Sequence, residues 1–502
     1  MIKEIKKKRL RYIVPFAFEA GEQEVAGLCE KLTGNSGEVN WVYEPPKEKE
    51  QDIYQLFEDT FRPNRRNHEN IGFSLKLTGQ DATGEILRIR YRRGDELPEY
   101  GFHISEAGLY LFRTGIGLFW YEIQENAEQE TSLDMEELIL FQNRFKELNS
   151  SVFFWYDDKN PKYSEDGSKK PNYVAEFLLE QKEAGGTLGY WIKELLDGLG
   201  CEINFYPNRK YCKNPEILVP DKAILFSYLV GEAENEEDIE EAAYYLSSGY
   251  NRTYLMPEDI REKMFRPFRG AYWYATKEGC GYYVQNHSVN EFFFSNYMPN
   301  KIASDYFVLY ILLLYQSYSL LHYANKIEKD MSADFRVYKD AAPGVAEWLE
   351  EFETEINVFL IKSVYASVSH IQHQNGFYEY VSKQLRIRED IDSLTLGLRS
   401  LDELQQMRQR KRDEEQEEKL STALGVLSLL AIISGFSDGF GFVDQMTVYF
   451  RGTGWTGIDY VTHIGIFILV LLIAFFAVKS VGKVLVRMTR DEIRKRRERK
   501  NK

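Results

Sequence analysis

The first 125 residues alternate apolar and polar side chains in short runs. A period of two places the apolar side chains on one face of a strand, so these runs predict a sheet. We expect strands over 11–18, 71–78, 85–91 and 109–123. In the third of them Ile86, Ile89 and Tyr91 are set among arginines, which is typical of an edge strand with a solvated basic face.

Helical spacing becomes more frequent further along the chain. Apolar residues three and four apart predict helices over 135–148 and 188–199, and an apolar run predicts another strand over 223–230. The acidic stretch 232–241 leads into a further helix. No Gly/Ser-rich linker or repeat interrupts residues 1–300, so we expect one cytosolic α/β (α+β) domain there.

Helical patterns dominate after Pro299, because only Pro343 occurs beyond it. We therefore expect residues 301–419 to form a helical region that ends in a long stalk helix. One face of an earlier helix is strongly apolar and is expected to run on through 364–371. Its residues are Trp348, Phe352, Ile356, Phe359 and Leu360.

An apolar seam follows at spacings of 4, 3, 4 and 3, formed by Ile387, Ile391, Leu394, Leu398 and Leu401. This spacing is typical of helices that pack together along their length. The charged stretch after the seam contains no Pro or Gly, so we expect one helix from about 381 to 435, about 80 Å long. An oligomeric stalk and an intramolecular bundle both fit the seam.

Two apolar segments near the C-terminus predict membrane-spanning helices. Residues 420–437 contain no ionisable side chain, and in 460–478 only His463 titrates near neutral pH. Each segment is close to the roughly 20 residues that cross a bilayer as a helix, and a lone span must satisfy its own backbone groups in lipid. Residues 438–459 between them are expected to form a short external loop.

A third apolar run, 306–323, is expected to be a buried core helix of the cytosolic part. Its second half contains Gln316, Ser319 and His322, and no strong basic cluster flanks it. A span here would also place the first 300 residues outside the cell.

Basic residues flank the two predicted spans. The tail 479–502 carries 11 Lys and Arg against 3 acidic residues, whereas the loop 438–459 has only Arg451. Because Lys and Arg stay on the cytoplasmic side, we expect a protein of the cell inner (cytoplasmic) membrane with both termini in the cytoplasm. The basic tail would then face anionic lipid.

Composition narrows the functional classes. The 502 residues carry a formal net charge of −15, and since the tail carries +8, the rest carries −23. An acidic body of this kind does not fit direct nucleic-acid binding. The four cysteines, at 29, 201, 212 and 280, have no metal or redox spacing, so the soluble part fits a reducing compartment.

No catalytic motif is present. The chain has no phosphate-binding Walker loop, dinucleotide fingerprint or nucleophile elbow, so we predict neither an enzyme nor a bound cofactor. His370 and His373 lie one helical turn apart, but no third ligand is evident nearby, and a solvated helix face explains them better than a metal site.

Small and hydroxyl side chains recur along one face of the first predicted span. They are Ser421, Gly425, Ser428 and Gly435, with Thr422 beside them. Such a face either lines a water-filled path, where hydroxyl groups solvate an ion, or packs closely against another helix. The two interpretations merge if several copies of the span surround one axis.

This organisation resembles the CorA superfamily, whose members join a cytosolic α/β domain through a long stalk helix to two C-terminal spans. The resemblance covers about residues 300–500 well and the N-terminal domain loosely. It implies a homopentamer in which the first span lines a pore. The family's Gly-Met-Asn triplet is replaced here by Gly439-Phe440-Gly441, so the asparagine that holds a hydrated cation is missing. Asp438 would form an anionic ring in a pentamer.

The chain looks more like the CorA-like proteins found with type III CRISPR systems, which lack the intact triplet and have a larger cytosolic domain. The segments 108–123 and 314–323 suggest this branch. The resemblance implies an antiviral effector. Its cytosolic domain would sense a nucleotide second messenger, an adduct of S-adenosylmethionine and AMP, and its membrane part would act as an ion channel.

A messenger pocket needs cations for phosphate and aromatic faces for adenine. The clusters 250–254 and 266–273 offer both, whereas 62–68 is basic without an aromatic other than its histidine. The candidate ligand-binding residues are Tyr250, Asn251, Arg252, Arg266, Arg269 and Trp273. For each of them the alternative is a surface loop with satisfied charges or a tyrosine of the core.

Three functions remain open from the sequence. The first is a ligand-gated membrane channel or effector, whose partners are the lipid bilayer, further copies of the chain and a small nucleotide. The second is a divalent-cation transporter of the Mg²⁺ type, which the altered triplet disfavours. The third is a membrane-tethered scaffold without transport.

Overall fold

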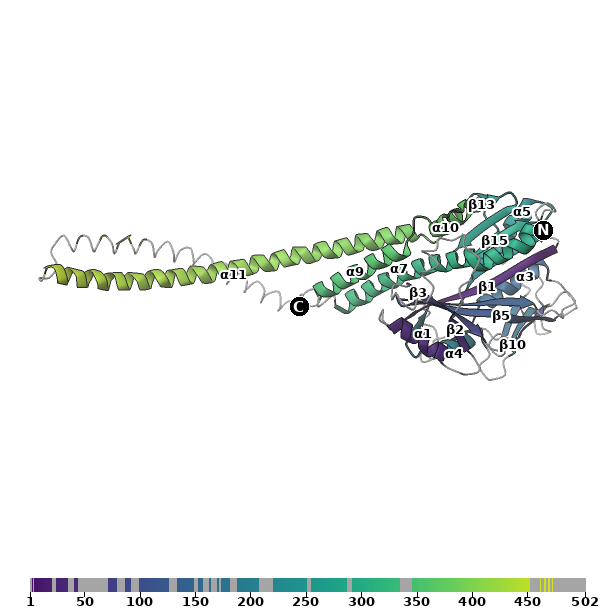
Figure 1. Cartoon of the computed structure of the whole chain (residues 1–502), viewed down its shortest axis with the longest axis horizontal. Coiled ribbons are helices and arrows are strands. Elements are labelled where there is room, and N and C mark those ends of the chain that lie inside the picture. Colours follow the sequence, from purple (N-terminus) through teal and green to yellow (C-terminus); the bar gives the residue numbers. More distant parts are fainter. Residues whose placement is uncertain are drawn as a thin grey trace. The chain divides into compact units, whose positions relative to one another are not determined.

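The computed structural model describes most of the chain up to Arg451 and single positions beyond it. The described residues are 2, 4–19, 24–34, 40–43, 71–78, 86–91, 99–125, 133–148, 152–156, 162–163, 169–170, 173–180, 187–206, 220–250, 254–286, 291–334, 345–451, 461, 465, 468, 469 and 472. The chain divides into two compact units, Met1–Leu396 and Gly397–Lys502. The first unit contains a large sheet with helices on both faces (Figure 1).

The sheet of the first unit has thirteen strands. Its main path runs through β13 (Phe265–Phe268), β14 (Ala271–Thr276), β15 (Gly279–Gln285), β12 (Ile224–Glu232), β1 (Glu4–Phe18), β6 (Ile116–Glu125), β5 (Glu99–Phe112), β4 (Ile86–Tyr91), β10 (Tyr173–Glu180) and β7 (Val152–Tyr156). Off this path, β11 (Ile203–Phe205) pairs with β1, and β2 (Asn40–Tyr43) pairs with β3 (Gly72–Thr78), which pairs with β5. A separate pair is formed by β8 (Lys162–Tyr163) and β9 (Lys169–Lys170). Among the described pairs, only β12 and β15 run parallel.

The strands agree with the sequence pattern in most places and differ in two. The run 109–123 is two strands, β5 and β6, because the chain reverses near Gly115, whose φ of +80° suits glycine. The run 85–91 is β4 as expected, but it pairs with β5 on one side and β10 on the other. The prediction of an edge strand there was wrong, since the pattern of 173–180 gave no sign that it would cover that edge.

One face of the sheet carries the main apolar core. Leu10, Tyr12 and Val14 of β1 point into it. The helices that cover this face are α1 (Glu24–Gly34), α3 (Met135–Lys146), α4 (Leu188–Asp197) and α5 (Glu236–Ser248). Local signals fix their ends: Asp134 and Glu137 form a capping box at α3, Asn235 caps α5, and Gly249 ends α5 with a φ of +70°.

A helix with an unusual period covers the opposite face. It alternates between π turns and α turns through η2 (Phe293–Tyr297), α6 (Met298–Lys301), η3 (Ile302–Tyr306) and α7 (Phe307–Asp334). Mixing the two turn types gives about four residues per turn, so side chains four apart lie on one straight line. The line that faces the protein interior is buried throughout: Phe294, Met298, Ile302 and Tyr306. Pro299 lacks a backbone N–H, which favours such an irregular ladder.

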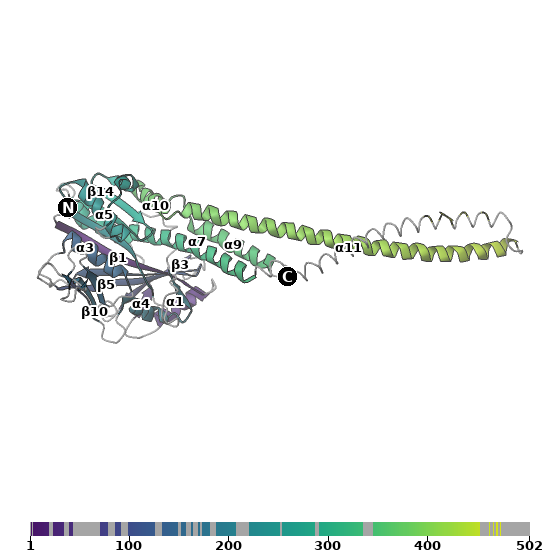
Figure 2. The ribbon, with the colours of Figure 1, turned by 180° about the vertical axis from the view of Figure 1, so that it is seen from behind.

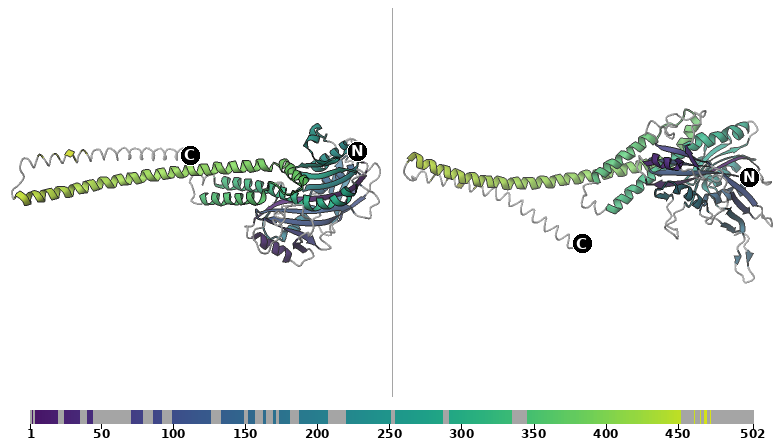
Figure 3. Two further views of the ribbon diagram at one scale, coloured as in Figure 1. Left: turned by 45° about the horizontal axis from the view of Figure 1, so that its top comes forward. Right: turned by 60° about the horizontal axis from the view of Figure 1, so that its bottom comes forward.

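The apolar run 306–323 is a core helix, as its polar residues suggested. The helix Phe293–Glu328 is long and apolar enough to cross a membrane, but 67% of its most apolar window is buried within the protein. Its polar residues have partners: the Gln316 side-chain amide donates to the carbonyl of Ser363 and to the Tyr378 hydroxyl, and Ser319 hydrogen-bonds Thr114. Figure 3 shows α7 beside α9 (Val345–Ser363).

The helix α9 is shorter than the sequence pattern predicts, whereas the later helix α11 is longer. The apolar face of α9 does not run on through 364–371, because α9 ends at Ser363 and a non-helical segment leads into α10 (Gln372–Gln384). The Asn375 side chain holds this segment by accepting from the backbone N–H groups of Val368 and Ser369. α10 packs on β13 and β14, and α9 packs on α7. These helices belong to the first compact unit, which ends at Leu396.

The long helix α11 spans Ile387–Arg451. It starts at Ile387 instead of near 381, because Arg386 adopts a left-handed conformation with a φ of 61°. Ile387 and Leu394 of the apolar seam are already buried in the single chain, so this part of the seam packs intramolecularly. Residues 438–451, expected in a loop, continue the helix, since no proline interrupts them. The rest of that loop, and the tail, lie outside the described residues.

Candidate functional site

The exposed side of α5 brings arginines and accessible aromatic rings onto one surface. α5 packs on β12, β14 and β15, and Figure 2 shows it beside β14. Alternation along β14 directs Tyr272 and Tyr274 into the core on the α5 side. The α5 side of β14 therefore presents tyrosines where the helix presents Glu240 and Tyr244.

Two arginines share one buried carboxylate on this surface. The Arg261 Nε donates to both oxygens of Glu240, at 2.8 and 3.0 Å, and an Arg266 terminal nitrogen donates to Glu240 Oε1 at 3.0 Å. Glu240 is buried, whereas both guanidinium groups reach solvent. The hydrogen bond and the charge of Glu240 raise the pKa of Arg261 above its ordinary value. Glu240 thus holds two cations, and Glu236 one turn earlier on α5 also acts on Arg261.

The geometry leaves donors available at both arginines. Within the described part of the chain, Glu240 is the hydrogen-bond partner of Arg261, and its two terminal nitrogens make no further bond. The Arg266 guanidinium lies over the ring of Tyr272, 5.0 Å from its centroid. Planar guanidinium groups held in fixed positions suit bidentate binding of phosphate oxygens.

A cluster of tyrosines begins one helical turn further along α5. Tyr244 is four residues after Glu240, so the two side chains are neighbours on the helix surface. The Tyr244 ring contacts Tyr250 at 5.9 Å and Tyr274 at 6.3 Å, and Tyr250 contacts Tyr254 at 5.2 Å between ring centroids. Tyr250 and Tyr254 are exposed, while Tyr244 and Tyr274 are buried beneath them.

Hydrogen bonds hold the backbone of both exposed tyrosines. The Tyr245 hydroxyl donates to the carbonyl of Tyr254 at 2.8 Å, and the Asn143 amide donates to the carbonyl of Tyr250 at 3.5 Å. The backbone of Tyr254 is therefore attached to α5 and that of Tyr250 to α3. Exposed aromatic faces beside arginines are the ingredients of nucleotide binding, with stacking for the base and charge for the phosphates.

A buried lysine lies at the C-terminal end of α5. The Lys146 ammonium group is 3.5 Å from Glu278, and a Cβ added at Gly249 would lie 2.7 Å from the lysine nitrogen. Burial lowers the pKa of Lys146, and Glu278 opposes the shift. A cation is favourable beside the last carbonyl groups of a helix, so we assign Lys146 to the stability of the α5 terminus.

The structure brings some of the predicted ligand residues together and separates others. Tyr250 and Arg266, from different sequence clusters, both lie on the α5 surface. Asn251 and Arg252 lie outside the described residues, as does the basic segment 62–68. Arg269 is exposed in the turn between β13 and β14, where Gly270 has a φ of +71°.

Trp273 differs from the expectation. It is fully buried, stacks on Tyr282 at 4.7 Å between centroids and contacts Phe377 in a tilted arrangement at 4.2 Å. Because neighbouring residues of a strand point to opposite faces, Trp273 faces α10, while Tyr272 faces α5. It belongs to the core and presents no ring to a ligand on the α5 surface.

Sequence reasoning missed Arg261, Glu240 and Tyr244. Glu240 was seen only as part of an acidic stretch, and nothing local distinguishes it from its acidic neighbours. The four-residue spacing of Glu236, Glu240 and Tyr244 was the available signal, since it places all three on one helix face. The pairing of Glu240 with Arg261 and Arg266 depends on the fold of the chain after α5.

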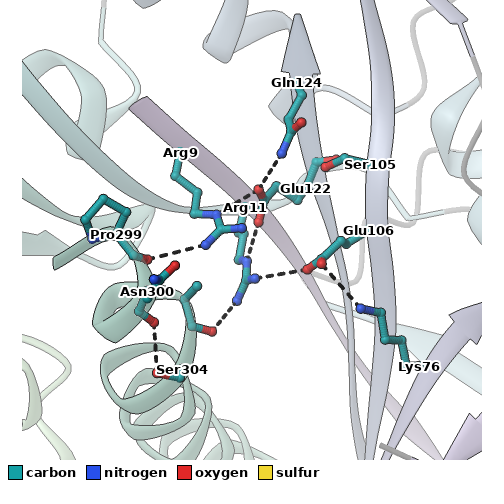
Figure 4. A network of polar contacts seen from close by, with 11 residues as sticks. Arg9, Arg11, Lys76, Ser105, Glu106, Glu122, Gln124, Pro299, Asn300 and Ser304 are labelled. Atoms are coloured by element: carbon teal, nitrogen blue, oxygen red, sulfur yellow. Dashed lines mark hydrogen bonds and ion pairs between the residues drawn. The ribbon is translucent and has the colours of Figure 1, made fainter. Parts of the chain in front are cut away.

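A second polar cluster lies on the other face of the sheet (Figure 4). Glu122 of β6 accepts from Arg9 at 2.8 Å and from Arg11 at 2.7 Å. Arg11 also donates to Glu106 at 3.2 Å, and Glu106 accepts from Lys76 at 3.3 Å. Burial alone would raise the pKa of Glu122, but the charges and hydrogen bonds of the two arginines outweigh it, so the pKa is lowered.

This second cluster joins the sheet to the irregular helix. Arg9 donates to the carbonyl of Pro299 at 3.3 Å and Arg11 to the carbonyl of Ala303 at 2.7 Å. The Arg11 guanidinium also contacts the rings of Trp120 and Phe307, at 4.6 and 4.5 Å from the ring centroids, and the two rings pack edge to face against each other. Its donors are taken up by the protein and aromatic rings lie against it, so we interpret this cluster as a structural joint.

All the candidate pore-lining residues lie in α11: Ser421, Thr422, Gly425, Ser428, Gly435 and Asp438. The Thr422 hydroxyl donates to the carbonyl of Glu418 at 2.7 Å, within the helix. The side chain of Asp438 is not among those described. In the ranges that the structure describes, no three His, Cys, Asp or Glu side chains gather as they would around a metal ion.

Comparison of the chain with protein-family models, with curated proteins and with solved structures finds no match.

Proposed function

We propose that the protein is an oligomeric membrane effector whose sheet unit binds a nucleotide messenger on the α5 surface and controls a membrane channel. The observation that carries the sensing half is the juxtaposition of an arginine pair with exposed tyrosines on that surface. By resemblance, the messenger is an adduct of S-adenosylmethionine and AMP, the assembly is a homopentamer, and the role is antiviral defence alongside a type III CRISPR system.

The chemistry of the α5 surface supports an anionic aromatic ligand. Arg261 and Arg266 would hold the phosphate with the donors that Glu240 leaves available. Tyr250 and Tyr254 would stack on the base. Glu240, which holds the arginines, and Tyr244, which packs beneath Tyr250, lie one helical turn apart on α5. A mononucleotide, whose phosphate and base are separated by a ribose, would extend along this surface from the arginines to the tyrosines.

The membrane half of the proposal rests on α11 and on charge. Leu420, Leu424, Leu427 and Leu430 are exposed apolar side chains, and the helix that carries them is continuous with the sheet unit's last helical residues. An uncharged helix of this length gains free energy by entering lipid. We propose 420–437 and 460–478 as two spans, with the basic tail and both termini in the cytoplasm.

Binding of the adduct to the purified full-length protein in detergent tests the sensing half. Replacing both arginines, Arg261→Ala and Arg266→Ala, removes the charged donors, and we expect the Kd to rise on the order of tenfold or more. Isothermal titration calorimetry measures the change. Lys277→Ala is the matched control, because it removes an exposed cation from the turn after β14.

Unchanged affinity in the double arginine variant would show that the ligand does not bind at the arginines of the α5 surface. Equal weakening by Lys277→Ala would reduce the effect to general electrostatics, which 1 M salt would also abolish.

A further inference from the structure

The short strand β13 lies between the α5 surface and α10. Its side chains contact both: Arg266 reaches Glu240 on the α5 side. Phe265 and Phe268 contact α10 instead, with ring centroids 5.9 Å from Tyr380 and 5.5 Å from His373. Arg261 comes from η1 (Glu258–Lys263), which leads directly into β13. Both arginines of the proposed site are therefore attached to one short segment that also packs on α10.

β13 is held weakly by the sheet. It has four residues, lies at the end of the strand order, and pairs with β14 at only two positions with an irregularity between them. Pro267, in its centre, has no N–H to donate. A strand with so few ladder hydrogen bonds shifts at a smaller free-energy cost than the strands inside the sheet.

The contact between β13 and α10 is close. A Cβ added at Gly376 of α10 would lie 2.6 Å from the Phe265 ring, so glycine is what lets the two elements approach. The Tyr380 hydroxyl donates to the carbonyl of Lys263 at 2.8 Å and accepts from the backbone N–H of Ala275 at 3.2 Å. This one hydroxyl links α10 to the start of β13 and to β14 together.

α10 is followed by a strained residue. Arg386, between α10 and α11, has a φ of 61° and is the non-glycine residue with positive φ among those described. A side chain in this conformation costs of order 1 kcal/mol or more, and such residues concentrate where a conformational change takes place. The strain lies at the point where a displacement of α10 would reach the first residues of α11.

We infer that β13 is the relay of the proposed sensor: ligand binding at Arg261 and Arg266 displaces β13, β13 displaces α10, and Arg386 lets α10 reorient against the start of α11. The inference rests on the proposed function, since it names how occupancy of that site is transmitted. It assigns Tyr380 and Arg386 as positioning residues that touch no ligand.

Tyr380→Phe tests the relay, with Tyr378→Phe as its matched control. Both remove a hydrogen-bonded hydroxyl from α10, but Tyr378 is bonded to Gln316 of α7, on the side away from β13. The full-length protein is reconstituted in dye-filled liposomes with the adduct of S-adenosylmethionine and AMP as the probe. We expect Tyr380→Phe to keep the wild-type Kd within twofold and to lose at least tenfold in ligand-induced dye release, while Tyr378→Phe keeps the release.

Hydrogen exchange on the same samples reports the relay directly. We expect the ligand to change amide exchange in 372–384 of the wild type and of Tyr378→Phe, and to leave it unchanged in Tyr380→Phe. Ligand-induced release and exchange equal to wild type in Tyr380→Phe would overturn the relay. Wild-type protein that neither binds the probe nor releases dye would instead contradict the proposed function.

Arg386→Gly keeps the test decisive if Tyr380→Phe misfolds. Glycine adopts the positive φ without strain, so we expect a higher melting temperature, an unchanged Kd and a weaker ligand-induced release. A variant that binds and releases dye as the wild type does would show that the strain at this residue plays no part in transmission.

Discussion

The two faces of the sheet each carry a pair of arginines on one glutamate, and the pairs differ in what surrounds them. In the joint, Arg11 has 5% of its side chain exposed, and its partner Glu122 has 1%. In the α5 surface, Arg261 has 55% exposed, and Glu240 has 3%. The glutamate is buried in both, so it fixes the arginines in both. Only on the α5 surface does the fixed pair face solvent.

The surroundings decide what a pair of arginines on one glutamate does. Arg11 directs its remaining donors to the Ala303 carbonyl and to Glu106, and the rings of Trp120 and Phe307 lie against it. Arg261 has donors left over and no ring above it that the structure describes. A fully satisfied buried cluster rigidifies a fold, whereas a fixed and exposed arginine pair is suited to binding an anion.

Breaking the joint should have the largest effect on stability. Glu122→Gln leaves Arg9 and Arg11 without their shared carboxylate in a buried environment, and removing one partner of a buried ion pair costs about 3–5 kcal/mol. We expect the free energy of unfolding of the full-length protein in detergent to fall by that amount, measured by urea denaturation with tryptophan fluorescence. A loss of less than about 1 kcal/mol would mean that water already reaches the joint.

The equivalent change on the α5 surface should affect binding more than stability. In Glu240→Gln, water can solvate the two exposed guanidinium groups, so we expect a cost of about 1 kcal/mol or less, as for an exposed ion pair. The arginines lose their fixed geometry, and we expect weaker binding of the adduct by calorimetry. If Glu240→Gln unfolded the protein as Glu122→Gln is expected to, the contrast between the two faces would not hold.

The free energy of unfolding should also depend on pH, in two separate pH ranges. We expect this effect to be smaller than that of the two substitutions above. The pKa of Glu122 is lowered below 4.5 in the folded protein, so its contribution is present above pH 4.5 and is lost as the pH falls through the folded value. Burial and Lys326 lower the pKa of His322 below 6.5, so the unfolded chain binds more protons and stability decreases as the pH falls below 6.5. Thermal unfolding from pH 8 to pH 3 checks both.

Two variants separate these windows. His322→Gln should remove the decrease that begins below pH 6.5 and keep the more acidic one, and Glu122→Gln should do the reverse. A single transition that neither variant alters would assign the pH dependence to other groups.

The sequence predicted elements well where one pattern dominated. Strands 11–18 and 71–78, the helices 135–148 and 188–199, and the core helix at 306–323 all follow from period and polarity. The sequence-based prediction failed where a residue's structure depends on a partner far away in the chain. The covering of β4 by β10 and the end of α9 at Ser363 depend on segments far away in the chain.

The candidate site shows the same division. Tyr250 and Arg266 were predicted from composition, because cations and rings near each other in the chain suggest a nucleotide site. Trp273 looked equivalent to them, and only the pairing of β14 places its ring on the opposite face. The proposed role of Arg261 depends on its ion pair with Glu240, 21 residues earlier, and no local pattern connects the two residues.

Ligand-induced dye release from liposomes tests the central claim most directly. The full-length protein is reconstituted without any partner, and the adduct of S-adenosylmethionine and AMP is added from the side of the sheet unit. We predict release with the adduct and none without it, and loss of that release in the variant with both Arg261→Ala and Arg266→Ala. Release that needs no ligand, or that persists in the double arginine variant, would contradict the account.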